Sequence, residues 1–590
     1  MLLSALTQVR ASSHFSVRPS AGGHQGIWLL HCVLKSSRAE RCLMLVVRSF
    51  PACLPSRTRL HRSRASSALV VACAAGLAIA VALAGSAAAV PILPWTPNGM
   101  AVAPTNLFQR SPAIAPDADG GAYVVWEDDR NGAWTTTTFI QRLNAAGVAQ
   151  GWSPLGYPLP NDGWPRGTPV ALPDGQGGVY VVDDGSRVMF VNRVAPDGDL
   201  SPAWPTTGVP VTGYPSGPIG GGCCHDFSPR FTLADNGLLF LVWIYESRFS
   251  SNGRVIALTD SGPTPPGWSS IGEYTQCVFC DDEATTIVAP SDSGAVFVAL
   301  HGYGFTVRKV DAAGGVNPVA YAFSGGRSPG LVPDGHGGVL GFWEDNSTGF
   351  IRVRAVHLLR DLSVAPGWDP TGNVLCDVPT AAGIDLHRVG WGTIPIRLSS
   401  VASDDAGGAF VVWTDYRDST GTGAGDIYAQ HVRGDGSLAQ GWPVNGLRVC
   451  NAAGDQRGPR IAADHAGGVV MCWEDRRNGV DFDIYALRVD GDGVVAPGWP
   501  ENGLAICTAS GDQTDPVLTT DDRGNAIIAW EDARSHGQVY AARVSDDALV
   551  PALGAFVDSH LSETSARIRW WVGPTTAAAV RVERARDLGA

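Results

Sequence analysis

The feature that most limits the fold of this chain is an internal repeat. Each copy has a short strand, a turn of the form Asp-x-x-Gly-Gly, a second apolar strand and, in most copies, the motif Trp-x-Asp-x-Arg. A third strand, a Gly-rich turn, a Gly-Trp pair and a last short strand complete the copy. Eight turn aspartates recur roughly 40 to 70 residues apart, a period typical of repeat architectures: Asp117, Asp174, Asp235, Asp292, Asp334, Asp404, Asp464 and Asp521.

Four short strands in each copy, with no helix-length amphipathic segment between copies, predict the blades of a β-propeller. A solenoid fits less well, because its repeats are shorter and its strands are parallel. The expected fold class is therefore all-β, a β-propeller of eight four-stranded blades. Seven blades are the alternative, because the copies with Asp235 and Asp292 diverge and have a turn that is one residue shorter.

The segment ahead of the first copy predicts how the ring closes. Residues 97–102, Pro-Asn-Gly-Met-Ala-Val, match residues 501–506, Glu-Asn-Gly-Leu-Ala-Ile, which form an outermost strand of the repeat. The eighth copy has three good strands and a poor fourth. We therefore expect the N-terminal segment to supply the missing strand, which would remove both free edges of the sheet.

A leader precedes the repeats. Basic residues crowd positions 57–64, an uncharged apolar run covers 68–84, and small residues follow. This order is typical of a signal peptide, here predicted at 57–90 and followed by cleavage. A membrane anchor is the alternative, although the run is slightly shorter than the ~20 residues that a span needs. Residues 1–56 are predicted to be an extension from a misassigned start.

The sequence divides the exported part into two regions. The propeller is predicted at 91–553, and a partial fibronectin- or immunoglobulin-like domain at 554–590. In that second region, the stretches 556–571 and 577–584 read as the first two strands of a sandwich. Two strands cannot bury a core by themselves, so we expect the domain to be truncated.

The charge distribution narrows the class of partner. The formal net charge is −13, and residues 1–90 hold ten basic side chains against one acidic, so the remainder is more acidic still. Phosphate binding requires a basic surface, which argues against nucleic acid or an anionic membrane as partner. Together with the leader, this predicts a secreted or cell-surface protein of a bacterial envelope that meets an extracellular glycan or protein. We expect no membrane span after signal cleavage.

The motif Trp-x-Asp-x-Arg is the first candidate site. It follows the second strand and shares a propeller face with the connections that contain Gln109, Gln456 and Gln513. A ring of these charges could bind a polar ligand or Ca²⁺. Because the motif recurs in most copies, pairing of Asp and Arg within each blade is the favoured interpretation. The four exact copies contain Asp128 and Arg130, Asp415 and Arg417, Asp475 and Arg477, and Asp532 and Arg534.

Two cysteine pairs lie in successive connections between copies: Cys223 and Cys224, and Cys277 and Cys280. In an exported chain, disulfides are the favoured prediction, with a zinc site and unpaired thiols as the alternatives. No metal site is assigned, and Ca²⁺ is the one cofactor that the acidic turns leave open. Three other cysteines share the end of the outermost strand and are expected to act as small buried hydrophobes: Cys376, Cys450 and Cys507.

The repeats resemble those of secreted bacterial proteins with sialidase-like propellers, which are often followed by an immunoglobulin-like module related to flagellar-hook assembly (FlgD-type) or by a sorting domain. The Asp-boxes of sialidases have the form Ser-x-Asp-x-Gly-x-x-Trp. This chain departs from that form, because its Asp-x-x-Gly-Gly lies in the first hairpin and its Trp comes five residues after the second Gly. The resemblance implies the fold, but the arginine triad and tyrosine nucleophile of sialidases map onto no specific positions here.

The leading functional hypothesis is an extracellular, non-catalytic propeller that binds or displays a glycan or protein. No nucleophile elbow, zinc-protease motif or phosphate loop occurs in the sequence. A sialidase-like glycoside hydrolase and a passive cell-surface structural component are the alternatives. The hydrolase hypothesis would gain support if candidates present in single copies converged, namely Asp183, Arg187, Tyr245 and Glu246.

Overall fold

The computed structural model describes residues 95–545 and three short strands towards each end of the 590-residue chain. Within 95–545, the residues outside the description are 133–135, 161–165, 186–187, 212–224, 248–249, 270–271, 275–285, 302–303, 325, 346, 348–351, 378–383, 386–400, 419–423, 522–523 and 535. Every regular element in the described part is a β-strand, and no described helix is long and apolar enough to cross a bilayer. The chain divides into two compact units, Met1–Leu83 and Ala84–Ala590.

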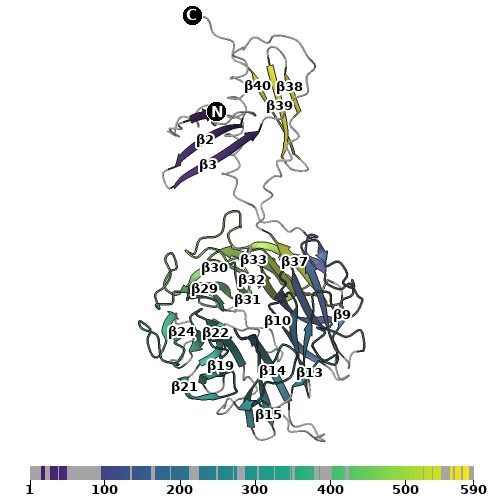
Figure 1. Ribbon diagram of the computed structural model, residues 1–590, viewed down its shortest axis with the longest axis vertical. Helices are drawn as coiled ribbons and strands as arrows, with labels where there is room; N and C mark the ends of the chain where they lie inside the picture. The colour runs from purple at the N-terminus through teal and green to yellow at the C-terminus, as the bar shows by residue number, and fades with distance from the viewer. Residues whose placement is uncertain are drawn as a thin grey trace, which may run out of the picture. The chain divides into compact units, whose positions relative to one another are not determined.

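Eight antiparallel sheets surround a common centre, so the fold is an eight-bladed β-propeller, as predicted (Figure 1). We call the strands of each blade A to D from the centre outwards. The first four blades consist of β5 (Gln109–Pro116), β6 (Ala122–Asp128), β7 (Thr137–Asn144), β8 (Gly147–Val148) and β9 (Tyr157–Pro158); β10 (Arg166–Pro173), β11 (Val179–Gly185), β12 (Met189–Val194) and β13 (Val209–Val211); β14 (His225–Leu233), β15 (Leu239–Ser247), β16 (Ser250–Leu258) and β17 (Glu273–Tyr274); and β18 (Thr286–Pro290), β19 (Val296–His301), β20 (Gly304–Val310) and β21 (Val316–Ser324).

The other four blades repeat the plan, with one change in blade 6. There, strand A is split into β26 and β27, which both pair with β28, and the residues between these two pieces lie outside the description. The strands are β22 (Gly326–Pro333), β23 (Val339–Asp345), β24 (Arg352–Leu358) and β25 (Asn373–Cys376); β26 (Ile384–Asp385), β27 (Val401–Ser403), β28 (Ala409–Asp415), β29 (Asp426–Val432) and β30 (Leu447–Cys450); β31 (Gln456–Ala463), β32 (Val469–Asp475), β33 (Asp483–Val489) and β34 (Leu504–Cys507); and β35 (Gln513–Thr520), β36 (Ala526–Asp532), β37 (Gln538–Val544) and β4 (Met100–Ala101).

The ring closes as the sequence predicts. Strand β4 pairs with β37 as strand D of blade 8, with Ala101 opposite Tyr540 and Met100 opposite Ala541. Just past the strand, the Val102 N–H donates to the carbonyl of Val539 at 2.9 Å. The first and last parts of the propeller therefore share one sheet, and β37 is covered by a fourth strand as in the other blades.

Packing between blades explains the composition of strand B. Every residue of β6, Ala-Tyr-Val-Val-Trp-Glu-Asp, is buried, because neighbouring blades cover both faces of the sheet. The motif tryptophans are almost completely excluded from solvent. Burying an apolar side chain contributes about 1.5–3 kcal/mol, so the buried Trp positions stabilise the packing between blades.

The turn between strands A and B explains the Asp-x-x-Gly-Gly pattern. In blade 1, Asp117 Oδ1 accepts backbone N–H bonds from Asp119 and Gly121 at 2.9 and 2.5 Å. Gly120 has a φ of 79°, which favours glycine. A β-carbon on Gly121 would collide with the carbonyl of Leu143 on strand C. Gly120 is therefore favoured by its backbone conformation, and Gly121 by the lack of space for a side chain.

The expectation for the turns of blades 3 and 4 was wrong. These turns have the same length as the others, and Ala234 and Ser291 occupy the position that Asp117 holds in blade 1. The aspartate is displaced by one residue, to Asp235 and Asp292. Asp235 instead accepts the N–H of Gly294 in the next blade at 2.6 Å, so the shift changes a bond within the turn into a bond between blades.

Two small sheets lie outside the propeller strands, and each is described by itself. The sheet in 1–83 is antiparallel and contains β1 (Phe15–Pro19), β2 (Ile27–Ser36) and β3 (Ala39–Arg48). The C-terminal sheet contains β38 (Asp558–Leu561), β39 (Ser565–Val572) and β40 (Thr576–Glu583). The stretch expected as one strand over 556–571 is thus two strands, and the assignment of this region to an immunoglobulin-like family stays a prediction.

Candidate functional site

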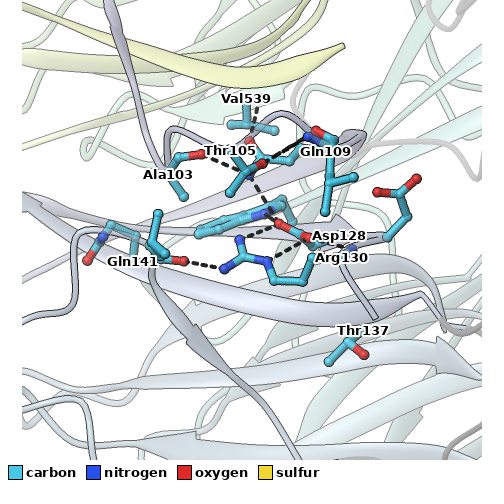
Figure 2. A network of polar contacts seen from close by, with 12 residues as sticks. Ala103, Thr105, Gln109, Asp128, Arg130, Thr137, Gln141 and Val539 are labelled. Atoms are coloured by element: carbon cyan, nitrogen blue, oxygen red, sulfur yellow. Dashed lines mark hydrogen bonds and ion pairs between the residues drawn. The ribbon is translucent and has the colours of Figure 1, made fainter. Parts of the chain in front are cut away.

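The Trp-x-Asp-x-Arg motif forms a closed network in blade 1 (Figure 2). Asp128 is fully buried, and its Oδ2 accepts the indole Nε1–H of Trp126 at 2.9 Å and Nε2–H of Gln109 at 3.1 Å. Its Oδ1 accepts Nε–H of Arg130 at 2.8 Å. Burial alone would raise the pKa of Asp128, but the bonds from Arg130 and Trp126 hold that pKa below its usual value. The carboxylate is therefore kept ionised by its own blade.

The arginine of the motif joins three parts of the blade. The Arg130 guanidinium lies 3.8 Å from the ring centroid of Phe139 on strand C, a cation–π contact. Its Nη1 also donates to the carbonyl of Leu155, just ahead of the outermost strand, at 3.0 Å. The same stacking recurs in blades 6, 7 and 8, where the pairs are Arg417 with Tyr428, Arg477 with Tyr485 and Arg534 with Tyr540.

This geometry limits what the motif can bind. The aspartate side chains of all four exact motifs are fully buried, each is ion-paired with its own arginine, and each accepts the indole N–H of its tryptophan. A ligand or Ca²⁺ at these oxygens would have to displace both partners. The arrangement fits pairing within the blade, which stays a prediction for the motif's role.

The cysteines at the ends of the outermost strands are buried, but their surroundings are polar. The thiols of Cys450 and Cys507 each lie beside the motif arginine of the next blade, Arg477 at 3.5 Å and Arg534 at 2.9 Å. Burial, above all, raises the pKa of each of these two thiols to about 12. They are therefore protonated and poorly reactive at neutral pH.

Two of the four catalytic candidates lie in described surroundings. Asp183 on β11 is almost fully buried and accepts the hydroxyl of Thr138 in blade 1 at 2.9 Å. Tyr245 on β15 has the guanidinium of Arg254, from its own blade, 5.5 Å from its ring centroid. Asp183 is thus directed into a contact between blades rather than towards solvent, where a substrate would bind.

The remaining candidates fall outside the described residues. They are Arg187 and the cysteines 223, 224, 277 and 280, whereas the backbone of Glu246 is described in β15 without its side chain. The disulfide and zinc predictions for the cysteines therefore stay predictions. In the described part of the chain, no three His, Cys, Asp or Glu residues are grouped closely enough to hold a metal ion.

A glutamate follows the exact Trp in blades 1, 7 and 8, and in blades 7 and 8 it accepts a backbone N–H from the next blade. Glu474 accepts Nε–H of Arg457 at 2.8 Å and the backbone N–H of Asp515, in blade 8, at 2.8 Å. Burial raises the pKa of Glu474. A raised carboxyl pKa is common in catalytic acids, but only 3% of this residue is exposed and both of its oxygens are engaged. Its position suits a contact between blades better than catalysis.

Two more carboxyls stand opposite motif aspartates across strands B and C. The register places Asp426 opposite Asp415 and Asp483 opposite Asp475. Like charges in directly opposed positions destabilise a sheet. Burial, above all, raises the pKa of both Asp426 and Asp483 to about 6. These two side chains therefore gain protons at a mildly acidic pH.

The connection that closes the ring carries a surface feature that the sequence did not single out. In the connections from blade 6 to 7 and from 7 to 8, an aspartate precedes the recurrent glutamine. Asp455 Oδ1 accepts the N–H of Gly425 at 2.8 Å, and Asp512 Oδ1 accepts that of Phe482 at 3.0 Å. Each of these hydrogen bonds caps the loop between strands B and C of the preceding blade. At the ring closure, the equivalent residue is Phe108.

Phe108 is 49% exposed and lies against the backbone of Gly537, in the B–C loop of blade 8. Its main chain keeps the bonds of the other connections, because its carbonyl accepts the N–H of Asp129 at 3.1 Å. Arg110, two residues on and therefore on the same side of the strand, is exposed and binds Glu127 at 2.8 Å. A comparison of residues before Gln109, Gln456 and Gln513 could have found this site.

These contacts define the protein as an eight-bladed propeller with a buried Asp–Arg pair in each exact copy of the motif. No protein-family model and no curated protein matches the sequence. The solved structures it resembles include Sqt1 from Chaetomium thermophilum, with 13% identity, a TM-score of 0.42, and coverage of 76% of this chain and 99% of that one.

Two further solved structures come from bacteria. An endo-arabinase from Bacteroides thetaiotaomicron has 12% identity and a TM-score of 0.23, over 45% of this chain and 96% of that one. A Dyadobacter fermentans protein of unknown function has 11% identity and a TM-score of 0.30, over 55% of this chain and 94% of that one. Likeness at this level assigns no activity, because propellers host many unrelated functions. The resemblance to sialidases and to FlgD-type modules stays a prediction.

Proposed function

We propose that this protein is a secreted, non-catalytic propeller that binds an extracellular glycan at the ring closure, with Phe108 as the platform on which a sugar ring stacks. One observation carries the proposal. Of the three connections that contain the recurrent glutamine, two have an aspartate before it, and the ring closure has a half-exposed aromatic ring instead. Function in a repeat protein is expected where one copy departs from the others.

The surroundings of Phe108 favour a glycan over a protein partner. Sugars present C–H groups that pack on an aromatic face while their hydroxyls bind polar groups at its edge. The exposed guanidinium of Arg110 and the carboxylate of Asp129 supply such groups. A stable protein interface buries about 800 Å² per partner. Among the described residues, only Leu107 adds a large exposed apolar side chain next to Phe108.

The recurrent acidic and basic pairs support a non-catalytic role. In the described blades with the exact motif, Asp and Arg are occupied by one another and by tryptophan and backbone groups. Asp183 is likewise engaged with a neighbouring blade. A substrate would meet aromatic and guanidinium groups at the closure, whereas glycoside hydrolysis uses two carboxylates at a set separation.

The test is affinity electrophoresis of the full chain in gels that contain pectate, alginate, xylan or dextran. Phe108→Asp is the informative variant, because Asp455 and Asp512 show that the connection accommodates an aspartate. We expect retardation by at least one polysaccharide and an affinity loss of about tenfold in the variant. Val444→Ala, at a highly exposed apolar position elsewhere, is the matched control. Equal retardation of wild type and Phe108→Asp would refute the proposed site.

A further inference from the structure

A second repeated network lies on strand C and, in blades 1, 2, 4, 5 and 6, it reaches the next blade. In seven blades, an aspartate in the A–B turn region pairs with a cation on strand C. In blade 1, Arg142 binds Asp117 through Nε at 2.8 Å, and its Nη1 donates to the carbonyl of Pro196 in the C–D turn of blade 2 at 3.2 Å. The indole N–H of Trp152 donates to the same carbonyl at 3.0 Å. We call this arrangement of aspartate, cation and carbonyl a latch.

Blades 5 and 6 have histidine where blades 1, 2, 7 and 8 have arginine. In blade 5, His357 Nε2 lies 2.8 Å from Asp334 Oδ2, and its Nδ1 lies 3.0 Å from the carbonyl of Gly434 in blade 6. The indole N–H of Trp368 donates to that carbonyl at 2.9 Å. The latch geometry is the same as in blade 1, but the cation is one that can lose its charge.

Blade 6 repeats this arrangement. His431 Nε2 lies 3.0 Å from Asp404 Oδ2, and its Nδ1 lies 3.0 Å from the carbonyl of Gly491 in blade 7. The ring stacks on Phe410 with a centroid separation of 3.9 Å, and Trp442 donates to the Gly491 carbonyl at 2.9 Å. Both histidines are therefore held in position by packing as well as by hydrogen bonds.

Each imidazole faces hydrogen-bond acceptors on both sides. A carboxylate and a carbonyl oxygen cannot donate, so both ring nitrogens must carry a proton for both bonds to form. The doubly protonated imidazolium meets that condition, whereas neutral imidazole has one N–H and must give up one bond. An imidazole ordinarily changes between these forms between about pH 5 and 8.

We propose that the joints between blades 5 and 6 and between blades 6 and 7 are acid-stabilised latches, which loosen as the pH rises through the range in which imidazole loses its charge. The joints that are held by an arginine latch stay closed over the same pH range. This regulation concerns blades 5 to 7 and is independent of the glycan site proposed above.

The charged groups around the histidines support this direction. Burial alone would raise the pKa values of Asp334 and Asp404, but hydrogen bonds from His357 or His431 and from backbone N–H groups hold both pKa values below their usual range. Both groups therefore stay ionised in mild acid, where the imidazolium forms. In the facing turns, Arg433 and Asp435 flank Gly434, and Asp490 and Asp492 flank Gly491. The charges of the first turn are of opposite sign, and those of the second turn are both negative.

Two carboxyls on strand C of blades 6 and 7 act in the same direction. The pKa values of Asp426 and Asp483 are raised to about 6, so these side chains are neutral in mild acid and charged at higher pH. Ionisation then places each of them opposite a motif aspartate. Raising the pH thus weakens the latches and adds like-charge repulsion in blades 6 and 7, whose turns receive the latches.

The experiment is hydrogen exchange of the full chain at pH 5.5 and pH 8, corrected for the intrinsic pH dependence of exchange. The turns 433–437 and 490–494 receive the histidine latches, and the turn 195–199 receives the arginine latch of blade 1. We expect protection in the first two turns to fall about fivefold between pH 5.5 and pH 8, because each turn loses one net hydrogen bond. Protection in 195–199 should stay constant.

The double variant His357→Arg/His431→Arg supplies the permanent cation found in the other blades, so its protection should not depend on pH. His465→Arg is the control, because that histidine pairs with Asp405 on the surface and 43% of its side chain is exposed. Equal pH dependence in all three turns of the wild type would overturn the proposal, whether or not the variants fold. Loss of protection that persists in the folded double variant would overturn it as well.

Discussion

Two kinds of connection between blades differ at the residue before the recurrent glutamine, which is aspartate in one kind and phenylalanine in the other. The connections that contain Asp455 and Asp512 join blades that follow one another in the sequence, and the one that contains Phe108 joins blade 8 to blade 1 and closes the ring. All three make the same two backbone hydrogen bonds. The N–H of the glutamine that follows donates to a carbonyl in the B–C loop of the preceding blade, and the carbonyl of the residue before the glutamine accepts an N–H from the B–C loop of the next blade. The side chains differ, and Phe108 stands where the other two connections have an aspartate. The closure therefore keeps the structural contacts of the repeat and alters the surface.

The closure also copies a second detail of the internal joints. Asn445 and Asn502 adopt positive φ and accept a backbone N–H from the end of the preceding blade's outermost strand. Asn98, with a φ of 61°, accepts the N–H of Thr508 at 3.0 Å in the same way. A segment from the start of the propeller thus substitutes for one that would otherwise follow β37.

The largest expected effect comes from breaking the motif at the closure. Asp532→Ala leaves the Arg534 guanidinium without its carboxylate, and Trp530 without its acceptor. Removing one partner of a buried pair costs about 3–5 kcal/mol. Because Arg534 also donates to the Asn98 carbonyl at 2.7 Å, the loss should extend to the closing strand.

The measurement is chemical denaturation of Asp532→Ala beside Asp475→Ala, which breaks the equivalent motif of blade 7. We expect both variants to lose stability, and only Asp532→Ala to expose the amides of β4 to rapid exchange. If neither variant lost more than about 1 kcal/mol, the description of the motif as a buried pair would be wrong.

A smaller effect should separate the closing strand from an internal one. A β-carbon on Gly99 would collide with the Trp530 ring, and one on Gly503 would lie 2.6 Å from the Trp473 ring. Each Gly→Ala variant should cost about 1–3 kcal/mol through overpacking and through the positive φ of these residues. Near the chain's start, strain can be relieved by detachment of β4.

Hydrogen exchange would distinguish these responses. In Gly99→Ala, amides of β37 that face β4 should exchange faster while the rest of the ring stays protected. In Gly503→Ala, the chain continues on both sides of the strand, so destabilisation should spread over blade 7. Identical exchange patterns in the two variants would show that closure by β4 is no weaker than the internal joints.

The smallest effect concerns pH. The pKa of Asp483 is raised to about 6, above its value in an unfolded chain. Stability from this group is therefore fully present below pH ~4 and is lost as the pH rises through 6. Asp483→Asn removes the charge and should raise the free energy of unfolding by about 1–2 kcal/mol at pH 7.5. It should change stability little at pH 4.

Thermal unfolding at pH 4 and 7.5 measures this difference. Asp199→Asn, in the exposed C–D turn of blade 2, is the control and should have no such pH-dependent effect. A stabilisation by Asp483→Asn that was equal at both pH values would contradict the raised pKa. A destabilisation at pH 7.5 would contradict the repulsion from Asp475.

The sequence predicted the ring well because comparing copies of the repeat identifies strands that are far apart in the sequence but belong to one sheet. Residues 97–102 match an outermost strand, and this match alone located the closure. The displaced aspartates at 235 and 292 show the limit of such matching, because a shift of one residue becomes visible only in the hydrogen bonds of the turn. The pattern placed the aspartates correctly in six blades and wrongly in two.

The sites were harder to predict than the fold. Phe108 is an ordinary apolar residue in the sequence, and its exposure depends on the Gly537 backbone beneath it. His357 and His431 look like ordinary strand residues until each ring is seen between a carboxylate and a carbonyl of the next blade. Side-chain surroundings, rather than residue type, identify these positions.

The most direct test of the proposed function is a hydrogen-exchange footprint of the full chain with the polysaccharide that retards it most strongly in affinity electrophoresis. Bound polysaccharide should protect peptides that cover 104–111 and 536–538, around Phe108 and Gly537. The internal connection 451–455 should not change. Protection at 451–455 as strong as at the closure, or none at 104–111 under saturating ligand, would contradict binding at the ring closure.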